Sequence, residues 1–269
     1  IDFLGTPVAG TTGYDHSDML FELEVAFSNI LKRLEDHGIL DETLVIFTSD
    51  NGGLGLNESS SGHNPNEGVR GYKAGIWEGG HRVPLFIKWG DKIPAGSYSH
   101  MVGVHDLYTT IAQLVGKNQG PEQGLDAVSL LPILLAGNTA PVRETMLHGS
   151  SDSQADPVSF KARALREGTY KMIWNKDAGA PIYLYDLATD PLETTSLLNE
   201  PSQADRVARM TAQMTDYIAL IPDSGRHLDH RSEALPSLRD LNENGMDDDW
   251  EVYWFGSTNA VSGGPYDDF

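Results

Sequence analysis

The chain has 269 residues, of which 39% are hydrophobic and 22% are charged, so its length and composition are those of a globular protein with a sizeable core. Its formal net charge is −20, which argues against nucleic acid or an anionic membrane as partner because both require basic patches. It contains no cysteine, which excludes disulfides, thiolate zinc sites and cysteine nucleophiles within these residues. No apolar run is long enough to cross a bilayer.

The first half of the chain alternates between helical and strand patterns. Residues 17–38 predict an amphipathic helix, because apolar residues recur there at helical spacing. The apolar run at 43–49 predicts a strand that is buried on both faces, and residues 83–89 predict a second one. Residues 106–115 predict another helix. This alternation predicts an α/β sheet with helices on its faces.

The pattern changes near residue 140. Short strands are predicted at 142–148, 160–166, 169–175 and 181–187, with a hairpin turn at Glu167-Gly168. A helix marked by Val207, Met210, Met214 and Tyr217 follows, so we expect a small antiparallel sheet with one covering helix. The expected domains are 1–139 for the α/β core, 140–221 for the small sheet and helix, 222–239 for a linker, and 240–269 for an acidic tail.

Asp50 and Asn51 come directly after the first predicted strand. Functional groups in open α/β sheets gather at the C-terminal ends of the strands. A carboxylate beside an amide oxygen suits Ca²⁺ or Mg²⁺ rather than zinc. The run Asp-Asn-Gly-Gly also fits a simple turn, because Asn-Gly is a common turn signal. The long loop at 52–80 favours a functional site, since long loops without a function are uncommon in compact domains.

Several motifs in and after this loop resemble one known family. TSDNGG ends the first strand, and GHNP followed by GVRGYKAGIWEGGHRVP fills the loop. GVHDLYTTIAQLVG, REGTYKMIW and IYLYDLATDPLETTSLL come later in the chain. Together they resemble the formylglycine-dependent, arylsulfatase-like sulfatases of the alkaline phosphatase superfamily, over residues 1–221. The resemblance implies a partial alkaline-phosphatase-like sheet and the hydrolysis of sulfate esters.

The resemblance also implies roles for individual residues. The aspartate and asparagine of the SDNG motif are calcium ligands in this family, and here they are Asp50 and Asn51. The lysine of RGYK contacts the sulfate, which assigns that role to Lys73, whose charge would offset charge that develops on the leaving oxygen. His63 lies where similar loops place a histidine in the substrate pocket, and a histidine bonded to the loop backbone fits equally. The expected substrate is a sulfated small molecule or carbohydrate.

The other charged and glycine residues of the loop are expected to serve structure. Glu78 is expected to form an ion pair with Arg82 or Arg70 that fixes the loop. Gly79 and Gly80 are expected to permit a close backbone approach or a positive φ angle.

The nucleophile of this family is a cysteine or serine in a Cys/Ser-x-Pro/Ala-x-Arg motif, which is oxidised to formylglycine. We expect no nucleophile in this chain and place the formylglycine upstream of Ile1, together with a signal peptide. The chain would then be the C-terminal portion of the enzyme and inactive by itself. Two alternatives stay open: a phosphate or phosphonate ester hydrolase of the same superfamily, and a calcium-binding attachment module without catalysis.

A second calcium motif lies near the end of the chain. Residues 240–251 match D-x-[DN]-x-[DN]-G-x₅-E at every specified position. The expected ligands are Asp240, Asn242, Asn244, Met246, Asp248 and Glu251. Met246 would bind through its backbone carbonyl and Asp248 through a water molecule. A solvated acidic tail is the alternative interpretation. The motif resembles calcium-binding tail repeats of secreted bacterial proteins, which implies a secreted or periplasmic bacterial enzyme.

Overall fold

A computed structural model describes residues 7–55, 63–66, 68–117, 124, 126–137, 140–150, 162–175 and 178–220. The chain divides into two compact units, residues 1–215 and 216–269. The predicted linker and the predicted calcium loop at 240–251 lie outside the described residues, and the predicted domain boundaries stay predictions. Among the helices that the structure describes, none combines the length and the apolarity that crossing a bilayer requires.

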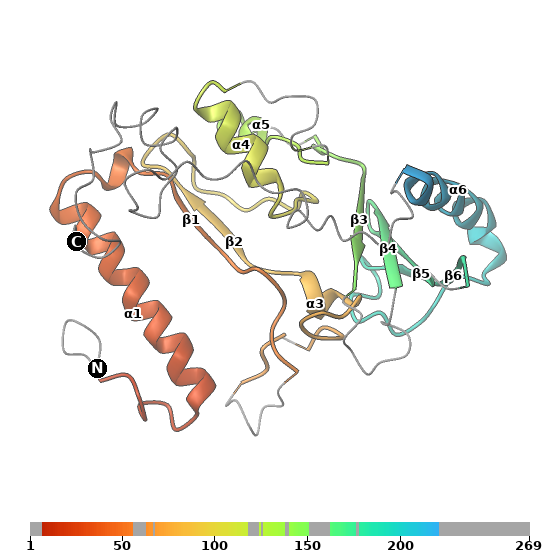
Figure 1. The fold of residues 1–269 in the computed structure, drawn as a ribbon, viewed down its shortest axis with the longest axis horizontal. Helices are drawn as coiled ribbons and strands as arrows, with labels where there is room; N and C mark the ends of the chain where they lie inside the picture. Colours follow the sequence, from red (N-terminus) through yellow and green to blue (C-terminus); the bar gives the residue numbers. More distant parts are fainter. Residues whose placement is uncertain are drawn as a thin grey trace, which may run out of the picture. The chain divides into compact units, whose positions relative to one another are not determined.

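The strands β1 (Val45–Thr48) and β2 (Leu85–Lys88) lie side by side (Figure 1) and form a two-stranded antiparallel sheet. In this sheet Val45 pairs with Lys88. Both predicted strands therefore exist, but the prediction that they are buried on both faces is wrong for the described chain. Each residue of β1 is only half-buried, and Phe86 of β2 is 66% exposed. Among the described residues this sheet has only two strands, so both are edge strands, and neither has the neighbours on both sides that a central buried strand has.

Helix α1 (Asp15–Asp36) corresponds to the predicted first helix and ends just before Gly38, which has a φ angle of +69°. It packs on β1 through Phe27, whose ring centroid lies 5.1 Å from that of Phe47. Leu20 and Ile30 of the predicted apolar face are nevertheless 47% and 57% exposed. The amphipathic pattern therefore predicts the helix correctly, while much of its apolar face contacts solvent in the described structure.

Shorter helices lie before, between and after the two strands of the first sheet. They are η1 (Leu40–Glu42), α3 (Glu78–His81), α4 (Asp106–Leu114) and α5 (Leu131–Leu134). Helix α4 confirms the helix predicted at 106–115. Asp106 is fully buried at its start and accepts hydrogen bonds from the amides of Gly103 and Val128, at 2.7 and 2.9 Å. It also pairs with the guanidinium of Arg143, so this carboxylate ties three segments together.

The small antiparallel sheet has the strand order β3-β4-β5-β6, formed by Thr145–Gly149, Ala162–Glu167, Tyr170–Asn175 and Ala180–Asp186. This confirms the predicted small sheet, and Gly168 turns the β4–β5 hairpin with a φ angle of +55°. The short helix η2 (Pro201–Gln203) leads into α6 (Ala204–Leu220), where the Thr211 hydroxyl lies 3.9 Å from the Met172 sulfur. The buried apolar residues of this layer are Leu165, Met172, Leu184, Met210 and Met214.

The opposite face of the small sheet contacts the long loop. Ala164, Ile173 and Tyr183 lie opposite one another on adjacent strands, so their side chains share this face. Ile76 and Trp77 of the loop are buried against the face and form one apolar cluster with Ala162, Ala164, Ile173 and Tyr185. The loop is therefore held between the end of the first sheet and the second sheet.

Candidate functional site

The segment that follows β1 carries the two predicted calcium ligands. Asp50 is exposed and Asn51 is half-buried. The Asn51 side-chain nitrogen donates to the Gly52 carbonyl at 3.0 Å, and the Ser49 hydroxyl donates to the Asn51 carbonyl at 3.0 Å. These bonds fix a turn. The side-chain oxygen of Asn51, which is the atom that would bind calcium, does not take part in the bond to Gly52.

Backbone hydrogen bonds join this turn to the loop that carries Lys73. The Lys73 amide donates to the Gly53 carbonyl at 2.8 Å, and the Gly52 amide donates to the Gly80 carbonyl at 3.0 Å. Since neighbouring Cα atoms are about 3.8 Å apart, Lys73 lies within a few residues' length of Asp50. The structure thus brings the predicted calcium ligands and the predicted sulfate-contacting lysine into one region, with Lys73 exposed.

Glycine is required where these two segments meet. A Cβ atom added at Gly52 would lie 1.9 Å from the Gly79 carbonyl oxygen, and one added at Gly80 would lie 2.2 Å from that of Gly75. A Cβ atom at Gly79 would lie 2.4 Å from the Gly71 oxygen. The close backbone approach expected at Gly79 and Gly80 is therefore confirmed.

His63 contacts α1. Its Nδ1 lies 3.2 Å from the Ser17 hydroxyl, and its ring is stacked on His16 with centroids 5.0 Å apart. These contacts with α1 test neither of the two expected roles, so the role of His63 stays a prediction.

The donor set for calcium is incomplete in the described part of the chain. No group of three or more His, Asp and Glu side chains is arranged there to hold a metal ion. Ca²⁺ takes about six to eight oxygen ligands, so Asp50 and Asn51 have the right chemistry but need further ligands. Their assignment, and that of Lys73 as the sulfate contact, stay predictions.

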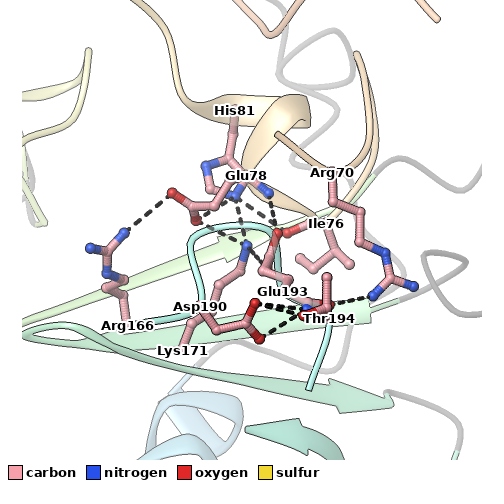
Figure 2. A network of polar contacts seen from close by, with 9 residues as sticks. All are labelled: Arg70, Ile76, Glu78, His81, Arg166, Lys171, Asp190, Glu193 and Thr194. Carbon is pink, nitrogen blue, oxygen red and sulfur yellow. Dashed lines mark hydrogen bonds and ion pairs between the residues drawn. The ribbon is translucent and has the colours of Figure 1, made fainter. Parts of the chain in front are cut away.

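A buried ion-pair network anchors the same loop (Figure 2). Glu78, Lys171 and Glu193 are all buried. The Lys171 ammonium lies 3.0 Å from Glu78 Oε1 and 2.7 Å from Glu193 Oε1, so it is shared between two carboxylates. Arg166 adds a second cation at 3.4 Å from Glu78 Oε2. The expected pairing of Glu78 with Arg82 or Arg70 is wrong, since its ion pairs are with Lys171 and Arg166.

Glu193 holds the loop with its backbone as well as its side chain. Its Oε2 accepts a hydrogen bond from the Glu78 amide at 2.8 Å, and its carbonyl accepts one from the Arg70 guanidinium at 2.7 Å. The same guanidinium lies 3.5 Å from the centroid of the Trp77 ring. Glu193 has a φ angle of +53°, which is uncommon for a residue with a side chain. The carboxylate of Asp190 accepts hydrogen bonds from the Thr194 and Thr195 amides and stabilises this turn.

The pKa values of the two carboxylates of the network are shifted in opposite directions. Burial acts to raise the pKa of Glu78, but the positive charges of Lys171, His81 and Arg166 outweigh it and hold this pKa below its usual value. Burial dominates at Glu193 and raises its pKa, with Lys171 opposing the shift. Glu78, which has Arg166 as well as Lys171 beside it, is therefore kept ionised more firmly than Glu193.

Two histidines border the network. The rings of His81 and His148 lie 4.0 Å apart, and His81 Nε2 lies 3.3 Å from the Lys171 ammonium. Burial, followed by the charge of Lys171, lowers the pKa of His81 to about 4. Burial and the positive charges nearby also lower the pKa of His148.

Sequence reasoning missed Lys171, although a signal was present. Lys171 lies in a strand whose neighbours are apolar, and a lysine at an inward-facing strand position needs a buried partner. The partner, Glu78, lies 93 residues earlier in the chain. Nothing in the sequence alone indicates which acidic residue that is.

A match to the nucleophile motif was also missed. Ser202-Gln203-Ala204-Asp205-Arg206 fits Cys/Ser-x-Pro/Ala-x-Arg and spans η2 and the start of α6. Arg206 donates to the Glu167 carboxylate at 3.1 Å, and its guanidinium lies 3.5 Å from the centroid of the Tyr170 ring. The arginine thus attaches α6 to the small sheet, and we do not assign Ser202 as the nucleophile.

Two protein-family models match the chain. The model described as Sulfatase matches residues 15–117. The model described as N-sulphoglucosamine sulphohydrolase, C-terminal, matches residues 72–219, which is more than half of the chain.

Individual relatives agree with these models. The chain is 35% identical over 136 residues to N-acetylgalactosamine-6-sulfatase of Homo sapiens, covering 50% of this chain and 25% of that protein. It is 33% identical over 249 residues to arylsulfatase D of Homo sapiens, covering 80% of this chain and 40% of that protein. Among solved structures, the PsFucS1 sulfatase from Pseudoalteromonas sp. matches with a TM-score of 0.60 and 25% identity, over 75% of this chain and 42% of that chain.

The chain therefore spans less than half the length of each of these relatives. The structural likeness confirms the predicted fold class, a mixed α/β arrangement of helices and antiparallel sheets like that of known sulfatases. With one model matching over more than half of the residues, the chain belongs to the sulfatase family of the alkaline phosphatase superfamily.

Proposed function

We propose that this chain is part of an enzyme that hydrolyses sulfate esters. The observation that carries the proposal is the pair of backbone hydrogen bonds that joins the turn after Asp50 and Asn51 to the loop of Lys73. The side-chain oxygens of Asp50 and Asn51 are of the hard type that Ca²⁺ prefers, and their proximity to Lys73 supports a tetrahedral anion held between a divalent cation and an ammonium group.

Each residue has a definite task in this proposal. Asp50 and Asn51 would supply oxygen ligands to Ca²⁺, which when bound would polarise the sulfate group. Lys73 would contact a sulfate oxygen and offset the charge that develops as the ester bond breaks. A local cation is needed because the chain carries a formal net charge of −20, which repels an anionic substrate.

The nucleophile is proposed to be a formylglycine supplied by sequence outside these 269 residues. Two findings support this: the chain has no cysteine, and it spans only 25% to 40% of the two human relatives. We accordingly propose that the 269 residues alone do not turn over substrate.

The proposed substrate class is a sulfated carbohydrate or a smaller sulfate ester. The relative that is 35% identical is named for a 6-sulfate of N-acetylgalactosamine, which supports a sulfated sugar. We further propose a secreted or periplasmic bacterial enzyme, in which the 240–251 loop binds a second Ca²⁺. The match of that loop to the calcium consensus supports this assignment.

The test uses the full-length gene product that contains this chain, produced with a formylglycine-generating enzyme. We expect it to hydrolyse 4-nitrophenyl sulfate in a calcium-dependent manner, and to do so faster than 4-nitrophenyl phosphate or a phosphonate monoester. Lys73→Met should lower kcat/KM by about 10²–10³-fold, the loss typical of one electrostatic contact to the reacting group. Lys88→Met, at an exposed lysine of β2, is the matched control and should change little.

Three results would contradict the proposal. One is preference for the phosphate or the phosphonate, which would favour the alternative ester chemistry. Another is equal activity of the Lys73 and Lys88 variants. The third is the absence of turnover of any sulfate ester by full-length protein in which formylglycine is verified by mass spectrometry, which would favour a non-catalytic calcium-binding module.

A further inference from the structure

We propose that Lys171 is a positioning residue for the loop at 70–80, and that through this loop it sets where Lys73 lies. This inference rests on the proposed function, because Lys73 is there the sulfate contact. Lys171 comes from β5 of the small sheet and bridges Glu78 of the loop to Glu193 of the turn after β6 (Figure 2).

The loop is attached to the small sheet by two kinds of contact. Ile76 and Trp77 pack in the apolar cluster with Ile173, and Glu78 follows them directly along the chain. Side chains two residues apart on a strand point to the same face, so Lys171 and Ile173 face the loop together. Apolar packing brings the loop onto the sheet, while the ion pairs fix its position along the sheet.

The geometry of the ion pairs makes this position well defined. Lys171 is fully buried, and a buried ammonium is costly unless carboxylates lie at close range. Its 3.0 Å contact with Glu78 is lost if the loop moves by a small fraction of its length, whereas its 2.7 Å contact with Glu193 joins it to the turn after β6. Well-packed apolar residues at these positions would be as stable or more stable, so the charges favour one loop position rather than stability as such.

Glu193 shows that the arrangement is held against local strain. Its backbone has a φ angle of +53° and its side chain is fully buried, a combination that persists only where surrounding contacts impose it. Those contacts run to the loop: the Glu78 amide donates to its carboxylate, and Arg70 donates to its carbonyl. Two ends of the 70–80 loop are therefore tied to one residue.

The backbone of the loop carries this constraint to Lys73. The Gly79 amide donates to the Arg70 carbonyl at 2.7 Å, which closes the loop at its base. Inside the loop, the Gly75 amide donates to the Tyr72 carbonyl at 2.9 Å. The Lys73 amide also donates to the carbonyl of Gly53, which lies in the turn after β1. A loop closed by such short internal bonds moves as one piece, so fixing Glu78 also fixes Lys73.

The first test measures hydrogen exchange in the full-length protein and needs no catalysis. Lys171→Met should raise exchange of the 70–80 amides at least about tenfold relative to the small-sheet amides, because two buried carboxylates lose their shared cation. Met172→Ala is the matched control: the adjacent side chain is equally buried but faces α6, so it should loosen the sheet without selective exchange in the loop. Glu193→Gln keeps the shape of the carboxyl group and should give a smaller rise in the same amides if Lys171→Met does not fold.

The second test is a double-mutant cycle on sulfate hydrolysis by the same protein. If Lys171 acts through Lys73, Lys171→Met should lower kcat/KM in the wild-type background and should lower it little further when Lys73→Met is present. Lys171→Arg, which retains the charge, should recover part of the loss. A purely structural role would instead give additive losses.

The outcomes separate the inference from the proposed function. Unchanged loop exchange in both Lys171→Met and Glu193→Gln, or exchange that rises equally in Met172→Ala, overturns the positioning role. Additive losses in the cycle also overturn it. If the wild-type protein hydrolyses no sulfate ester, the proposed function fails, and the exchange measurement still decides whether Lys171 positions the loop.

Discussion

The two sheets of the first unit differ in how completely they bury their apolar residues. In the small sheet, Leu165 and Leu184 are fully buried, and α6 covers the face that they share. At the first sheet, by contrast, Leu20 of α1 and Phe86 of β2 remain exposed although the sequence pattern there is just as apolar. The predicted helix and strands exist in both regions, so local pattern determines the element and a separate partner determines its burial.

The incomplete packing has a definite location. An apolar hollow of ≈ 970 Å³ lies against the first sheet, and its lining includes Phe27, Phe47, Phe86, Leu130 and Ile133. The small sheet, with its own hairpins and covering helix, has a fully buried apolar core within the same chain. The 70–80 loop joins the two regions, and its ion pairs are on the side of this buried core.

The largest effect that tests this contrast comes from truncating apolar side chains in the 269-residue chain. Leu184→Ala should lower the free energy of unfolding by about 2–5 kcal/mol, because it leaves a cavity in a closed core. Leu20→Ala, at a side chain that is already exposed, should change it by about 0.5 kcal/mol or less. Urea unfolding followed by circular dichroism measures both. Equal losses would show that α1 is buried in solution and would remove the contrast.

The next effect concerns the contact between the turn after β1 and the loop. Gly52→Ala should destabilise the chain by about 1–3 kcal/mol or more, since its Cβ would overlap the Gly79 carbonyl. Gly96→Ala is the control, because a Cβ there meets Tyr98 at an ordinary 3.5 Å. The measurement is again urea unfolding. A Gly52 variant as stable as the Gly96 variant would mean that the two segments are not held together as described.

The sequence predicted the elements better than it predicted the interactions between them. The apolar period of α1 and the Gly168 hairpin are local signals, and local signals suffice to place helices, strands and turns. The glycines of WEGG predicted a close backbone approach, which the structure shows at Gly79 and Gly80. These features depend on residues that are neighbours in the chain.

The ion pairs could not be predicted in the same way. Glu78 had two arginines on its own segment of the chain as expected partners, but it pairs with Lys171 because the small sheet folds against the loop. The choice among cations depends on which strand face meets the loop, and that is a property of the tertiary fold. The inward position of Lys171 indicates that it needs a partner, without indicating which one.

A smaller effect should appear in the dependence of stability on pH. His81 has a folded-state pKa of about 4 against an ordinary value of 6.5, so the unfolded chain binds the proton first. Stability should therefore fall as the pH drops from about 6.5 towards 4, because folding must exclude a proton that the unfolded state takes up. His148, with its lowered pKa, acts in the same direction. Above pH 6.5 neither group should matter.

Thermal unfolding between pH 4.5 and 7.5 measures this dependence. Glu193, whose pKa is raised by burial, contributes in the opposite direction as the pH falls, so the contribution of His81 is measured as the difference between the wild type and His81→Gln. His81→Gln should flatten the curve below pH 6.5, whereas His105→Gln, at an exposed histidine beside Asp106, should not. An unchanged slope in His81→Gln would mean that the imidazole accepts a proton in the folded network.

The smallest expected effect is at Ser202, and it tests which region supplies the nucleophile. Ser202→Ala should leave stability within about 0.5 kcal/mol and sulfate-ester turnover unchanged in the full-length protein, because Ser202 is exposed. The arginine of its motif contacts Glu167 and Tyr170, so it attaches α6 to the small sheet. Loss of turnover in this variant, with folding intact, would move the chemistry into the small sheet and place the nucleophile within these 269 residues.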